Sequence, residues 1–82
     1  MSNLHETRAQ ALRQLAGAHA EIAGHWSQSS REALNLAQSL QRDPNAFEHY
    51  ATIAKSDGRT AELHRNLAEF AETAAIVTSR GR

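Results

Sequence analysis

The chain has no cysteine and only one proline among its 82 residues. Without cysteine, a disulfide framework and thiolate metal ligands are excluded. It also has no apolar run near the ~20 residues that a membrane-spanning helix needs, and no signal peptide is evident. From these absences we expect a cytoplasmic protein that makes no contact with a membrane.

An excess of charge of either sign is absent as well. Nine basic and nine acidic side chains give a formal net charge of zero, so no overall field attracts nucleic acid or an anionic surface. Hydrophobic residues make up 40% of the chain but only four are aromatic, and much of the rest is alanine. A chain of this size buries about 60% of the surface that its unfolded form exposes, so we expect a thin core that gains from association.

The single proline divides the chain into two nearly equal arms. Pro44 cannot continue an arriving helix, and it restricts the residue before it to extended conformations. Asp43 is suited to cap the next helix, in which proline is well tolerated at the first position. We therefore predict one all-α domain at 1–82, an antiparallel helical hairpin with arm one at 4–41, the turn at 42–45 and arm two at 45–78.

The first arm carries two parallel stripes. Asn3 with Glu6 has the form of a capping box and predicts a helix start near Leu4. The stripe of large residues alternates steps of three and four, which is typical of a helix with a seam along one side. Its members are Leu12, Leu15, Ile22, Trp26, Ala33, Leu36 and Leu40, with His19 and Ser29 at the remaining positions of the alternation, and beside them runs a stripe of small residues, Ala16, Ala20, Ala23, Ser27 and Ser30. Because the large stripe keeps its phase across the low-propensity segment 24–30, we favour one continuous helix.

The second arm contains a strong turn signal. Asp57 followed by Gly58 is typical of a turn, and Thr60 could cap a new helix, so we predict a kink or break near 56–60. Beyond it, large residues share one side, at Leu63, Leu67, Phe70, Ala74 and Val77, while alanines recur every seven residues at Ala54, Ala61, Ala68 and Ala75.

Each arm thus has more apolar flank than an isolated pair of helices can bury. We expect the alanine-rich sides to pack within the hairpin and the large side chains to meet a second copy or another protein, in a helical bundle. The competing interpretation is a self-contained monomeric bundle of three or four short helices. The predicted interface residues are Leu12, Leu15, Ile22, Trp26, Leu63, Leu67 and Phe70.

No pattern indicates chemistry. Five histidines are present, but the His-Glu-x-x-His pattern is not, and neither are the paired Glu-x-x-His motifs of di-iron bundles. We interpret His19 as a polar residue of the seam that fixes register, and the others as partly exposed. The serines lie at caps and in the low-propensity segment, without a base or an oxyanion site. We expect no catalytic residue, metal, cofactor or small-molecule substrate.

An alternative interpretation makes residues 50–67 resemble a helix-turn-helix. Ala54 would lie at the helix crossing, Gly58 in the turn and Thr60 at the cap of a recognition helix. The DNA contacts would be Arg59, His64, Arg65 and Asn66. Two positions depart from that pattern, since Arg59 replaces an aliphatic residue and His64 a β-branched one.

Taken together, the sequence favours a small non-catalytic interaction module that associates with itself and with a protein partner. An adaptor, an inhibitor or an assembly subunit would fit this description. The burial of one helix face against another would supply the binding free energy.

Overall fold

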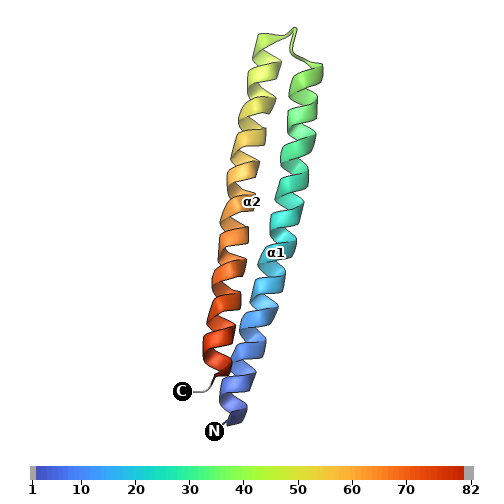
Figure 1. The fold of residues 1–82 in the computed structure, drawn as a ribbon. Coiled ribbons are helices and arrows are strands. Elements are labelled where there is room, and N and C mark those ends of the chain that lie inside the picture. The colour runs from blue at the N-terminus through green and yellow to red at the C-terminus, as the bar shows by residue number, and fades with distance from the viewer. Residues whose placement is uncertain (1, 81–82) are drawn as a thin grey trace.

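Two long helices lie side by side along the whole molecule (Figure 1). The computed structural model describes residues 2–80, with α1 at Ser2–Ser39 and α2 at Pro44–Ser79. The first residues of α1 and the last residues of α2 lie at one end of the rod and the turn lies at the other (Figure 1), and the principal extents are 64 × 14 × 10 Å. The all-α helical hairpin predicted from the sequence is confirmed.

The turn forms as the single proline predicts. Asp43 has an extended backbone with φ −107° and ψ 100°, and its carboxylate accepts a hydrogen bond from the amide of Ala46 at 3.3 Å. Pro44 occupies the first position of α2, where its missing amide hydrogen costs nothing. At the end of α1, the amide of Leu40 donates to the carbonyl of Leu36 at 3.1 Å. Asp43 is therefore the N-cap of α2, as predicted.

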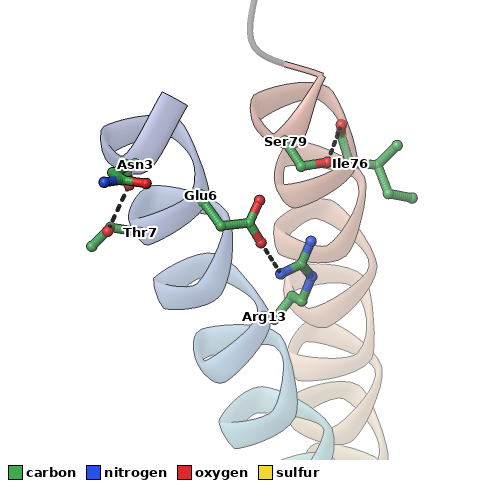
Figure 2. Close-up of polar contacts among 6 residues, drawn as sticks. All are labelled: Asn3, Glu6, Thr7, Arg13, Ile76 and Ser79. Carbon is green, nitrogen blue, oxygen red and sulfur yellow. Dashed lines mark hydrogen bonds and ion pairs between the residues drawn. The ribbon is translucent and has the colours of Figure 1, made fainter. Parts of the chain in front are cut away.

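The first arm is one helix, and the predicted continuity through 24–30 is confirmed. It begins at Ser2, however, so Asn3 lies inside the helix and the predicted capping box is wrong. The Asn3 carbonyl accepts a hydrogen bond from Thr7 Oγ1 at 2.8 Å, and Glu6 forms an ion pair with Arg13 at 3.5 Å (Figure 2). Glu6 therefore supports the helix through a partner seven residues on.

The predicted break in the second arm is wrong, because α2 runs without interruption through 56–60. Thr60 caps nothing, since its hydroxyl donates back one turn to the carbonyl of Ser56 at 3.1 Å. Asp57 is buried and accepts a hydrogen bond from Ser29 of α1 at 2.6 Å. Local propensity would place this aspartate in a turn, but the hydrogen bond from the opposite helix provides its carboxylate with a partner inside the helix.

The core is a seam of alanines between the two helices. No large side chain among residues 2–80 is fully buried. The buried apolar residues are Ala9, Ala16, Ala23, Ala33, Ala37, Ala54, Ala61, Ala68, Ala71 and Ala75. Most of them recur every seven residues, so they form a continuous line along each helix. The alanine-rich sides do pack within the hairpin, and this arrangement leaves the large side chains outside.

The low-propensity segment of α1 lies against the same part of α2. Ser30 Oγ donates to the carbonyl of Ala54 at 2.7 Å, one turn before Asp57. A β-carbon built on Gly58 would lie 3.5 Å from Ser30 Oγ, which is ordinary van der Waals contact. The serines that weaken α1 locally therefore contact the residues that weaken α2, and each helix compensates the other.

Candidate functional site

The hairpin has two flanks, and hydrogen bonds between the helices identify them. On one flank Arg65 Nη1 donates to Ser27 Oγ at 3.0 Å. A residue two positions further along a helix lies about 200° around its axis. Ser29 and Leu67 are each two positions beyond this pair, so they lie on the opposite flank of their helices. The two flanks can therefore be compared residue by residue.

Large apolar side chains gather on the flank opposite Arg65. Leu15 and Ile22 precede Ser29 at steps of seven and Trp26 precedes it by three, so all four share one side of α1. On α2, Leu63 and Phe70 lie four before and three after Leu67, on one stripe. We call this surface the apolar face and define it as Leu15, Ile22, Trp26, Leu63, Leu67 and Phe70. Its side chains are exposed, from 37% for Ile22 to 74% for Phe70.

The hairpin brings these residues to one level although they come from different arms. His19 of α1 lies opposite His64 of α2, which sets the antiparallel register. Residues 12–26 of α1 therefore face residues 57–71 of α2. All seven predicted interface residues fall in this part of the rod, which is about 21 Å long. Leu12, the seventh, is half-buried at the seam, so it belongs to the edge of the apolar face.

The flank that carries Arg65 is different in character. Two shallow hollows open on it, side by side, between the helices. Small residues line their floor and charged side chains their rim, including Arg13, Ala20, Gly24, Arg65 and Glu72. We call it the polar flank. The two flanks of the rod therefore differ in the side chains that line them.

His19 and His64 form a pair between the helices, at the same height along the rod as the apolar face. His19 Nδ1 and His64 Nδ1 are 2.9 Å apart, their ring centroids are 5.1 Å apart and the rings are inclined by 26°. One nitrogen donates a hydrogen bond and the other accepts it. The sequence assigned His19 to the stripe of large residues, and it did not pair His64 with it. The available signal was that each histidine follows a seam alanine, Ala16 or Ala61, by three residues.

The helix-turn-helix interpretation of residues 50–67 is wrong as a description of this structure. The segment is part of one continuous helix, so the turn that the motif needs is not formed. One of the four residues proposed to contact DNA is also partly withdrawn from the surface. Arg59, Arg65 and Asn66 are exposed, and Arg65 donates a hydrogen bond to Ser27, whereas His64 is half-buried beside His19.

Within residues 2–80, no three histidine, aspartate or glutamate side chains gather closely enough to hold one metal ion. In the same part of the chain, neither helix is sufficiently apolar over its length to cross a membrane. No protein-family model, curated protein or solved structure matches the chain.

Proposed function

We propose that this protein is a small, non-catalytic helical interaction module of the cytoplasm. It associates with a second copy through the apolar face and offers the remaining helical surface to a protein partner, as an adaptor, inhibitor or assembly subunit. One observation carries the proposal. The core of the hairpin consists of alanine, while six large apolar side chains at one level of the rod are exposed.

The exposed surface is larger than that of a compact monomer. A folded monomer of 9.0 kDa has an accessible surface of about 4,850 Å². The hairpin exposes 6230 Å², an excess of roughly 1,400 Å². A stable complex of standard size buries about 800 Å² on each partner. The excess on one chain is therefore sufficient for an interface with a second copy.

Charge and symmetry also favour a second copy as the occupant. The chain has a formal net charge of zero, so no overall repulsion opposes association between copies. A two-fold axis would set the same patch against itself, which is how most homodimers associate. Two hairpins joined in this way form a four-helix bundle, in which the large side chains occupy the centre.

A matched pair of substitutions in α1 tests the proposal. Leu15 lies on the apolar face and is 48% exposed, whereas Leu34, seven residues after Ser27, lies on the side of the polar flank and is 47% exposed. Leu15→Ala removes two leucines from each dimer interface, so we expect the dissociation constant to rise by at least roughly tenfold. Leu34→Ala makes the same chemical change outside the interface and leaves the constant unchanged. Sedimentation equilibrium measures both.

Equal effects of the two substitutions would contradict the assignment of the interface to the apolar face. A larger effect of Leu34→Ala would indicate that the interface lies on the polar flank instead. Both variants are also followed by circular dichroism, which confirms that helicity is retained.

A further inference from the structure

We propose that His19 and His64 form a two-histidine chelate that binds a divalent transition-metal ion with tetragonal or octahedral preference, such as Cu²⁺ or Ni²⁺. The two Nδ1 atoms face each other at 2.9 Å, one from each helix. Imidazole nitrogen is a good ligand for these ions. The site is complete within one hairpin, so it stands independently of the proposed self-association.

The two nitrogens are close enough to bind one ion once both rings have turned toward it. Imidazole nitrogens bind such metals at about 2.0–2.1 Å. Two ligands at that length and 2.9 Å apart subtend an angle of about 90° at the metal, which is the angle between adjacent ligands in square-planar and octahedral sites. A tetrahedral ion would require the nitrogens to move to about 3.3 Å. Cu²⁺ and Ni²⁺ stand high in the affinity order of divalent ions for nitrogen ligands, and water would fill the remaining positions.

The pair is isolated from other charged groups on its own helices. The neighbours one turn away on either side are all uncharged, and they are Leu15, Ala16, Ile22 and Ala23 on α1 and Thr60, Ala61, Leu67 and Ala68 on α2. No carboxylate or cation at these positions competes for the imidazoles. Each histidine therefore has the other as its nearby polar partner along the seam, and a metal ion would replace that single hydrogen bond.

Binding requires a change of tautomer in one ring and a rotation of both rings, because the two Nδ1 atoms point at each other along a hydrogen bond. In the neutral pair, one Nδ1 carries the hydrogen that it donates and the other presents its lone pair. When a metal binds, that hydrogen moves through solvent from Nδ1 to Nε2 of the same ring, and both rings turn so that their Nδ1 lone pairs face the ion. The neutral pair neither gains nor loses a proton. Both side chains are half-buried, so solvent reaches them.

The chelate joins α1 to α2 and so couples metal binding to folding. The two histidines are 45 positions apart in the chain and are adjacent only in the folded hairpin. An ion that binds the folded chain more tightly than the unfolded one stabilises it by mass action. Metal binding should therefore raise the melting temperature, which distinguishes this site from adventitious binding to an exposed histidine.

The test titrates the purified full chain with NiCl₂ and with CuCl₂ at neutral pH, using calorimetry and thermal melting. We expect one ion per chain and a rise in melting temperature of about 5 °C or more at saturation. His64→Ala should weaken binding at least tenfold and abolish that rise. His49→Ala removes an exposed histidine and should leave both unchanged. Equal binding by His64→Ala and the native chain would overturn the proposal, as would no binding at all.

A spectroscopic measurement on the native chain keeps the proposal testable if His64→Ala fails to fold. Electron paramagnetic resonance of the Cu²⁺ complex counts the nitrogens bound to the ion. Two imidazole nitrogens in a 1:1 complex support the chelate, and one or none overturns it.

Discussion

Replacing Ala61 by leucine is expected to destabilise the hairpin more than any other single substitution considered. Ala61 is 1% exposed at the centre of the alanine seam, where the small side chains let the helices lie close together. Three additional carbon atoms there must push the helices apart or adopt strained rotamers, which costs typically 1–3 kcal/mol. We expect a loss near the upper end, about 3 kcal/mol, or a fall of roughly 10–20 °C in melting temperature.

Thermal and urea unfolding of Ala61→Leu measure this loss. Ala11→Leu is the control, since Ala11 is exposed on α1 and the same substitution meets solvent there. Leucine and alanine both favour helix, so the control should change the stability by only a few tenths of a kcal/mol. If Ala61→Leu melts like the native chain, the helices are not in close contact at the seam, and the described core is incorrect.

Replacing Trp26 by alanine is expected to have the largest effect on association. Trp26 is the largest side chain of the apolar face and is 39% exposed in the hairpin. Tryptophan is enriched among residues whose truncation costs 2 kcal/mol or more at protein interfaces. Each dimer loses two such side chains, so we expect the dissociation constant to rise by at least roughly a hundredfold.

Helicity should persist in Trp26→Ala, because the alanine seam does not include this residue. Sedimentation equilibrium and far-ultraviolet circular dichroism, measured on the same sample, separate the two effects. Unchanged sedimentation with unchanged binding to a protein partner would reject the role of Trp26. Loss of helicity together with association would instead show that the hairpin depends on Trp26 for its own folding.

The sequence predicted those features that depend on local signals. Pro44 after Asp43 identifies the turn, since both residues have strong preferences there. The seven-residue recurrence of alanine, for example at Ala54 and Ala61, identifies the seam, because a helical period places such residues on one line. These two signals are sufficient for the antiparallel hairpin, which the structure confirms.

The features that the sequence did not predict depend on contacts between the helices. Asp57 before Gly58 favours a turn in isolation, but Ser29 of α1 donates a hydrogen bond to the Asp57 carboxylate and the helix continues. The donor, Ser29, is 28 residues away, so the sequence around Asp57 does not predict it. His19 and His64 are likewise far apart in the chain, and only the register that follows from the turn places them together. Local propensity was overridden where the opposite helix supplied a partner.

The apolar face depends both on local sequence signals and on how the two helices are arranged. Its members could be chosen from the sequence because large residues recur on one side of each arm. The structure adds that the chosen residues lie at one level of the rod and on one flank, opposite the Arg65 to Ser27 hydrogen bond. Whether that surface binds a second copy is the central claim of the proposal.

Sedimentation equilibrium of the native chain over a wide concentration range tests this claim most directly. The proposal predicts a mass of twice 9.0 kDa at high concentration, with dissociation on dilution. A single species of 9.0 kDa at every concentration would contradict it.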